Sequence, residues 1–221
     1  MEPQTNIRRR FLDNAMNKDR TLSYYNDQAS AYYQQTYAVS LNDIYRQFID
    51  KLTSDSVQTM LDVGCGSGRD SAYFANLGFT VTAVDGSVKL LNLAKENCEH
   101  DIDWLKLSFH DIAKQNWINH FTGIWACASL LHVPFNELPS ILNTLVIALK
   151  TDGVIYLSFK YGDRERLDGD RFFCDMNDSR IEQLLTKMPS VTLVKTWQSY
   201  DKRYANSTIW FNIIMIKLIE S

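Results

Sequence analysis

Apolar and polar positions along the chain follow two periods, and these predict alternating strands and helices. Short apolar runs typical of buried strands cover residues 57–63, 79–84, 102–107, 121–127 and 153–159. Between them, helical spacing predicts helices over 71–77, 88–98, 137–149 and 179–187. Two last apolar runs, 191–197 and 208–219, flank a polar turn and are expected to pair antiparallel. The alternation indicates an α/β fold with a mostly parallel sheet and right-handed crossovers.

The first 50 residues show no strand pattern. Residues 1–20 are polar and charged, and we expect a frayed start or a short helix there. Tyrosines recur near helical spacing over residues 23–37, and residues 41–52 carry apolar side chains on one helix face. We therefore expect residues 1–50 to form an N-terminal helical cap on a body of residues 51–221, the two making one structural domain.

A glycine-rich turn follows the first strand. The sequence LDVGCGSG places Gly64, Gly66 and Gly68 at alternate positions. Glycine allows positive φ and has no Cβ to hold a ligand away, so such a turn brings backbone N–H groups and a helix N-terminus against a ligand. Asp85 ends the next strand, where a carboxylate can accept hydrogen bonds from both hydroxyls of a ribose. The G-x-G-x-G spacing differs from the G-x-G-x-x-G of dinucleotide-binding folds, which disfavours a nicotinamide oxidoreductase.

LDVGCGSG followed at this distance by VDGS resembles motif I and the next acidic strand end of class I S-adenosylmethionine-dependent methyltransferases. The similarity is to the small-molecule and tellurite-resistance-like members, over about residues 57–219. It implies a Rossmann-like seven-stranded, mostly parallel sheet with an antiparallel last strand and helices on both faces. It also implies S-adenosyl-L-methionine as cofactor and S-adenosyl-L-homocysteine as product.

The resemblance assigns roles to several residues. Gly64 and Gly66 would line the methionine part of the cofactor, Asp62 would hold its amino group, and Asp85 would hold the ribose. A plain structural turn and a solvated strand end are the alternatives. Asp111 would accept from the adenine amino group, or else cap a short helix. Arg69 either faces the cofactor carboxylate or lies at the surface. The implied cofactor site also includes Cys65, Gly68, Arg69, Gly86, Ser87, His110, Ile112, Ala126, Cys127 and Ala128.

A second segment with candidate functional residues spans residues 125–134, with the sequence WACASLLHVP. It occupies the motif IV position but lacks the D/N-P-P-Y/F of amino-directed nucleic-acid methyltransferases, and it resembles the S-x-L-x-H-V segment of small-molecule enzymes. His132 is the candidate catalytic residue, either as a general base or as a group that orients the substrate. The alternative is a structural histidine that caps the backbone near Pro134.

Two further segments have open interpretations. Tyr25 and Tyr33 either pack in the core or form a lid over the cationic sulfonium, since aromatic faces attract cations by about 0.5–2 kcal/mol. The charged stretch 160–173 either contributes to the substrate pocket or is a solvated loop. In the first case, Arg164, Arg166 and Arg171 are candidates to hold an anionic part of the acceptor.

Composition narrows the range of partners. The 221 residues are 45% hydrophobic and 22% charged, as in ordinary soluble proteins, and the net charge of −3 disfavours a nucleic-acid partner. Four cysteines without a C-x-x-C pair indicate reduced thiols and a cytoplasmic location. We expect no signal peptide and no membrane-spanning run, and the scattered histidines and cysteines predict no metal site.

These observations predict an enzyme that moves a methyl group from S-adenosylmethionine to an N, O or S atom of a small-molecule acceptor. Such a reaction depends mainly on positioning, so the lack of a triad or metal set does not argue against it. An RNA-directed enzyme acting on a tRNA base and a non-catalytic S-adenosylmethionine-binding module remain alternatives. The sequence does not identify the acceptor or the oligomeric state.

Overall fold

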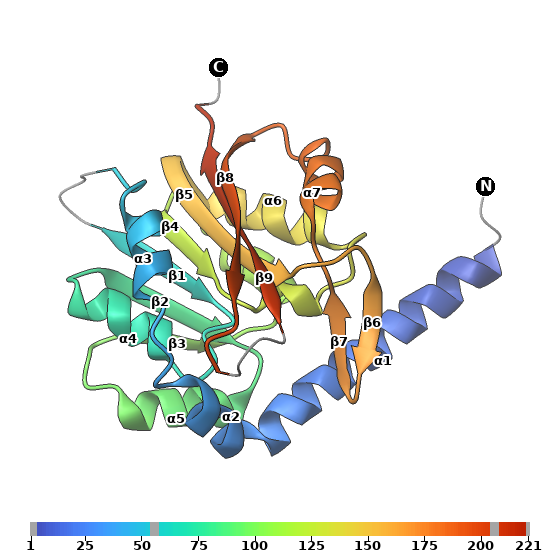
Figure 1. The fold of residues 1–221 in the computed structure, drawn as a ribbon, viewed down its shortest axis with the longest axis horizontal. Helices are drawn as coiled ribbons and strands as arrows, with labels where there is room; N and C mark the ends of the chain where they lie inside the picture. The colour runs from blue at the N-terminus through green and yellow to red at the C-terminus, as the bar shows by residue number, and fades with distance from the viewer. Residues whose placement is uncertain (1–3, 54–57, 204–207, 220–221) are drawn as a thin grey trace.

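The computed structural model describes residues 4–53, 58–203 and 208–219, and its centre is a seven-stranded sheet in the order β3-β2-β1-β4-β5-β9-β8 (Figure 1). Its strands are β1 (Thr59–Val63), β2 (Thr80–Asp85), β3 (Asp103–Lys106), β4 (Phe121–Ala126), β5 (Leu149–Lys160), β8 (Val191–Tyr200) and β9 (Ile209–Lys217). The first five strands pair in parallel, and β9 runs antiparallel to both of its neighbours. The predicted sheet is confirmed, although Val57, where the first strand was expected to begin, lies outside the described residues.

Helices cover both faces of the sheet. One layer contains α3 (Asn42–Ile49), α4 (Arg69–Asn76) and α5 (Val88–Asn97), and the other contains the 3₁₀ segment η1 (Phe109–Gln115), α6 (Leu138–Ala148) and α7 (Asp178–Leu185). Successive side chains of a strand point to opposite faces, so Trp125 of β4 packs on Phe48 and Phe74, whereas Ile124 packs on the side of Leu142. These two apolar layers fix the strand ends that carry the candidate site.

The N-terminal region begins with a long helix, not with the frayed or short one expected. α1 (Gln4–Asp27) runs for 24 residues and is followed by α2 (Ala29–Thr36). The first end of α1 projects beyond the body, and its later turns pass beside α5 and the β6–β7 hairpin described below (Figure 1). α3 instead packs in the body, where Phe48 is fully buried. Of the helices in the described part of the chain, none is both long and apolar enough to cross a membrane.

The charged stretch after β5 is a β-hairpin and not an irregular loop. β6 (Glu165–Asp168) pairs antiparallel with β7 (Arg171–Cys174). The hairpin packs on α1, where the Phe172 backbone N–H donates to the Thr21 hydroxyl at 3.0 Å and Arg20 pairs with Asp170 at 2.8 Å. Phe172 and Phe173 bury their rings, so these two adjacent apolar residues anchor the charged stretch to the body.

Candidate functional site

The three glycines of the turn serve different purposes. Gly64 has φ +73°, and a Cβ on it would lie 2.4 Å from the Cβ of Ser129, so this position has no room for a side chain. Gly66 has φ +56°, and a Cβ on it would meet only a ring carbon of Tyr32 at 3.6 Å. Gly68 is the residue that precedes α4. The turn therefore packs at Gly64 and presents its backbone to open space at Gly66.

Asp85 fixes this turn. Its carboxylate accepts one hydrogen bond from the Gly66 N–H at 2.8 Å and another from the Ser87 N–H at 2.7 Å. Burial raises the pKa of Asp85, and the backbone donors at Ser87, Gly66 and Gly86 oppose that shift. The carboxylate thus ties the end of β2 to the glycine turn while it lines the adjoining cavity.

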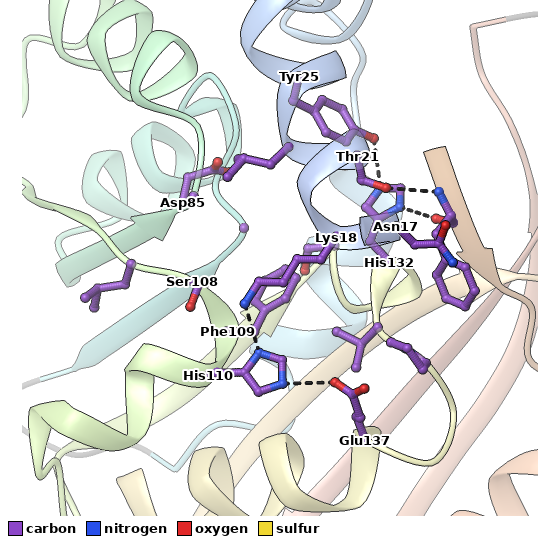
Figure 2. Close-up of a pocket in the computed structure, with 18 of the residues that line it drawn as sticks. Asn17, Lys18, Thr21, Tyr25, Asp85, Ser108, Phe109, His110, His132 and Glu137 are labelled. Atoms are coloured by element: carbon purple, nitrogen blue, oxygen red, sulfur yellow. Dashed lines mark hydrogen bonds and ion pairs between the residues drawn. The ribbon is translucent and has the colours of Figure 1, made fainter. Parts of the chain in front are cut away.

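That first cavity, of about 740 Å³, lies at the carboxyl ends of β1, β2 and β4 (Figure 2). The body contributes the glycine turn, the β2 end and the segment before η1, and α1 closes the opposite side. Residues that line it include Asn17, Lys18, Thr21, Leu22, Tyr25, Tyr32, Gly64, Gly66, Asp85, Gly86, Ser108, Phe109, His110, Ala128, Ser129, His132 and Glu137. Ligands of open α/β sheets bind at this edge, so the cavity is in the expected place.

Polar contacts hold α1 across this cavity. Lys18 Nζ donates to His110 Nδ1 at 3.3 Å, and His110 Nε2 donates to Glu137 at 3.0 Å (Figure 2). At the other end, the Ser87 hydroxyl donates to the Asn26 side-chain oxygen at 2.8 Å. The helix is therefore tied to both rims of the cavity and forms part of its wall.

His132 is held between two partners. Its Nδ1 lies 2.6 Å from the Phe172 carbonyl oxygen, which only accepts, so Nδ1 carries the proton. Nε2 is then the acceptor for the Tyr25 hydroxyl at 2.8 Å (Figure 2). Burial lowers the pKa of His132 to about 4, and burial raises the pKa of Tyr25. At neutral pH the pair is therefore an uncharged imidazole and an uncharged phenol.

A second cavity, of about 660 Å³, adjoins the first. Tyr25, Tyr32, Ala128 and His132 line both cavities, so the two meet at these side chains. Cys127 also lies in the second wall, but burial raises the pKa of its thiol to about 12, which keeps it protonated and weakly nucleophilic. A molecule in the second cavity would thus meet one in the first at the Tyr25–His132 pair.

A buried polar cluster supports the wall from behind. The Asp70 carboxylate accepts from Tyr45 Oη, from Trp125 Nε1 at 2.8 Å and from Arg69 Nε at 2.6 Å. Burial alone would raise the pKa of Asp70, but the Arg69 guanidinium and these hydrogen bonds hold it below its usual value. Arg69 in turn lines the second cavity, so of the two alternatives considered for it, the surface position is not observed.

The structure brings ten of the predicted site residues to the two cavities and places eight elsewhere. The first group contains Tyr25, Gly64, Gly66, Arg69, Asp85, Gly86, His110, Cys127, Ala128 and His132. The second contains Tyr33, Asp62, Cys65, Gly68, Ser87, Asp111, Ile112 and Ala126. Among these, Cys65, Ile112 and Ala126 are buried in the core, and the Ser87 hydroxyl caps α5 by accepting from the Leu90 N–H.

Three of the predicted residues that lie outside both cavities have specific partners. Asp62 lies behind the turn, accepts from the Ser71 hydroxyl at 2.6 Å, and has a pKa raised by burial and by the charge of Asp70. The Tyr33 ring stacks on Tyr37 at 4.6 Å, away from both cavities. The Asp111 carboxylate accepts from Lys114 and from Ser108, and its contact with adenine stays a prediction.

Several wall residues were not predicted. Tyr32, not Tyr33, meets Tyr25, with their ring centroids 5.2 Å apart. Lys18 and Thr21 were missed because the chain before Ser23 was not expected to form a long helix. The seven-residue interval from Tyr25 to Tyr32 spans the break between α1 and α2 at Gln28, so a count along the chain does not by itself identify this pair.

Comparison with known proteins places this geometry in context. Residues 60–153 match the model of a methyltransferase domain family. The chain is 33% identical over 105 residues to a ubiquinone biosynthesis O-methyltransferase of Actinobacillus pleuropneumoniae, covering 45% of this chain and 44% of the relative. It is 27% identical over 152 residues to a probable S-adenosyl-L-methionine-dependent methyltransferase TehB of Haemophilus influenzae, covering 61% and 51%. The chain thus spans about half the length of the curated relatives it matches.

A solved structure shares the fold over nearly the whole chain. The 1,6-didemethyltoxoflavin-N1-methyltransferase of Burkholderia thailandensis superposes with a TM-score of 0.71 at 19% identity, covering 96% of this chain and 90% of that one. The matched domain, which begins in β1 and ends in β5, contains the glycine turn, Asp85 and His132. Residues 60–153 are therefore similar to methyltransferase domains, and nearly the whole chain shares the fold of this solved methyltransferase.

Proposed function

We propose that this protein is an enzyme that transfers the methyl group of S-adenosylmethionine to an N, O or S atom of a small-molecule acceptor. The observation that carries the proposal is the meeting of two cavities at Tyr25, Tyr32, Ala128 and His132. The first has the features of a nucleoside site, and the second provides separate space for an acceptor. A methyl group at the junction would face that acceptor directly.

The residues of the first cavity fit the cofactor. Gly66 leaves its backbone open to the cavity, and Asp85 presents a carboxylate that is already oriented by two backbone N–H groups. The Ser129 hydroxyl is buried, lines the same cavity and has no hydrogen-bond partner in the described part of the chain. These groups offer an acceptor for ribose hydroxyls and a free hydroxyl beside the glycine turn, in support of a bound nucleoside with a polar tail.

When bound, S-adenosylmethionine supplies a methyl carbon already activated by a cationic sulfur. What the protein must add is alignment and the exclusion of water, which together account for much of the rate in such reactions. The α1 helix excludes solvent on one side, and Tyr25 and Tyr32 bring their rings to the junction, where aromatic faces favour a cation.

For an acceptor that arrives protonated, the Tyr25–His132 pair provides a hydrogen-bonding group that orients it. The Tyr25 oxygen can accept a hydrogen bond from the acceptor while its own proton points to His132 Nε2. Because the pKa of His132 is only about 4, the imidazole is a weak base and serves mainly to orient Tyr25. We therefore propose His132 as a positioning residue for Tyr25, not as the principal base.

Calorimetric titration with S-adenosylhomocysteine tests the first half of this proposal. We expect micromolar binding in the wild-type protein and a large loss in Gly66→Val. A tritiated methyl-transfer assay over small aromatic and heteroaromatic acceptors, with total cellular RNA as a parallel substrate, tests the second half. Binding without transfer to any acceptor would support the non-catalytic module, and label in RNA would support the RNA-directed alternative.

The cysteines support a reducing compartment. All four, Cys65, Cys98, Cys127 and Cys174, are unpaired. Reduced thiols are usual in the cytoplasm, and we propose that the protein works there.

A further inference from the structure

The second cavity contains an excess of positive charge beside the proposed transfer site. Of the described residues that line it, the cations are Arg69, Lys160, Arg171, Lys202 and Arg203, and the acids are Asp43 and Asp201. The Asp70 carboxylate pairs with Arg69, and Asp201 pairs with Arg203. The charge that remains is concentrated near the β6–β7 hairpin.

Arg171, the first residue of β7, is the key cation. Its guanidinium carbon lies 4.6 Å from the centre of the Tyr24 ring and 5.1 Å from the centre of the Phe173 ring. Within the described part of the chain no carboxylate lies within 4.0 Å of it, and its Nε is buried without a hydrogen-bond partner. Buried donors are nearly always satisfied, so this orphan nitrogen indicates a missing acceptor.

Lys160 strengthens the same patch. Its Nζ lies 3.8 Å from the centre of the Phe173 ring, and its side chain is only 19% exposed. The nearest carboxylate, that of Asp168, is 4.0 Å away and largely in solvent. Burial and the charges of Arg166 and Arg171 lower the pKa of Lys160, so this ammonium is held in an unfavourable, positively charged environment.

The position of this patch relates it to the proposed reaction. Arg171 lines the same cavity as Tyr25 and His132, which mark the junction with the first cavity. Aromatic side chains, with Tyr24, Phe173 and Trp197 among them, also line this cavity. A flat apolar molecule would fit these walls, and a negative charge on it would satisfy the cations.

We propose that the methyl acceptor carries a negatively charged group, such as a carboxylate, and that Arg171 with Lys160 binds it. This inference rests on the proposed methyltransferase function and deepens it by naming the substrate class. Charge-assisted hydrogen bonds to a guanidinium are among the stronger polar contacts, so loss of Arg171 should weaken acceptor binding about tenfold or more.

Fluorine NMR on the protein saturated with S-adenosylhomocysteine provides the test. The probes are 4-fluorobenzoate and its neutral counterpart, 4-fluorobenzamide. We expect the wild-type protein to bind the benzoate about tenfold more tightly than the amide, and Arg171→Gln to lose that preference. Arg171→Lys should restore part of it, and Arg164→Gln is the matched control, because Arg164 is an exposed cation just before the same hairpin and does not line the cavity.

The outcomes separate the two proposals. Equal binding of the two probes, or a preference that survives in Arg171→Gln, overturns the anionic acceptor while leaving cofactor binding untouched. A protein that binds no S-adenosylhomocysteine in calorimetry refutes the proposed function itself. Retained S-adenosylhomocysteine binding by Arg171→Gln shows that the variant is folded, so a lost preference is then attributable to the missing charge.

Discussion

Replacing Asp85 with Asn tests the central feature of the first cavity, the proposed cofactor site. The change keeps the shape of the side chain but removes its charge and turns one oxygen into an amide NH₂. Asp85 now receives N–H groups from both Gly66 and Ser87, and the variant can accept from only one of them. The substitution therefore perturbs the turn and the ligand-facing carboxylate together.

The expected magnitudes follow from these contacts. A backbone N–H left unpaired in a buried turn costs about 1–3 kcal/mol. Burial of the charged carboxylate raises the pKa of Asp85, and the substitution removes this burial cost. We therefore expect the free energy of unfolding to fall by an amount near the lower end of that range. For the ligand, losing a charged acceptor costs about 1.5–3 kcal/mol, or roughly ten- to a hundredfold in S-adenosylhomocysteine affinity.

Calorimetric titration gives the affinity, and urea unfolding gives the stability. Asp103→Asn is the matched control, because Asp103 is exposed at the start of β3, the strand next to β2, and lines neither cavity. We expect the control to match the wild-type protein in both measurements. A folded Asp85→Asn protein that binds S-adenosylhomocysteine within about twofold of wild type would show that Asp85 only builds the turn.

Three further predictions follow from the same geometry. Gly66→Val should abolish S-adenosylhomocysteine binding in calorimetry, whereas Gly78→Val, which has φ +89° but open space around its Cβ, should lose stability and keep its affinity. Because His132 is neutral in the folded protein, the free energy of unfolding should fall by about 3 kcal/mol as the pH drops from about 6.5 towards 4, since the unfolded chain takes up the proton first. Urea unfolding should show that the stability difference between wild type and His132→Phe shrinks at low pH. Deleting residues 1–36 should leave a folded body, since α3 is retained, yet remove α1 and Tyr32 from the cavity walls; a cooperative melt with lost affinity is expected, and a lost melting transition would contradict it.

The parts of the site that were predictable from sequence are those encoded within one short segment. The glycine turn and Asp85 follow from local spacing, because a strand, a tight turn and a helix fix each other over a dozen residues. Gly64 illustrates the limit of this reasoning, since its lack of a side chain is required by Ser129, which lies 65 positions later in the chain. Positive φ was foreseeable from the motif, whereas this packing partner was not.

The wrong predictions of site residues fall where the chain changes direction, or where the face of a strand decides which way a side chain points. Tyr32 meets Tyr25 across the break between α1 and α2 at Gln28, whereas Tyr33 stacks on Tyr37. Asp62 sits between residues of β1 that pack under α6, so its side chain points to the opposite face, towards Ser71. Both outcomes depend on tertiary packing that a count along the sequence does not contain.

The division of the site between two parts of the chain explains why the donor is easier to identify than the acceptor. The glycine turn, Asp85 and Ala128 all lie in the segment shared with the family model, residues 60–153. Tyr25 and Tyr32 come from α1 and α2, and Arg171 comes from the hairpin, outside that segment. Similarity over the shared segment thus carries information about the nucleoside cavity. Much of the second cavity is built by elements outside that segment, so its proposed ligand must be inferred from its own side chains. Among these, Arg171 is the most specific, because its buried Nε has no hydrogen-bond partner in the described part of the chain.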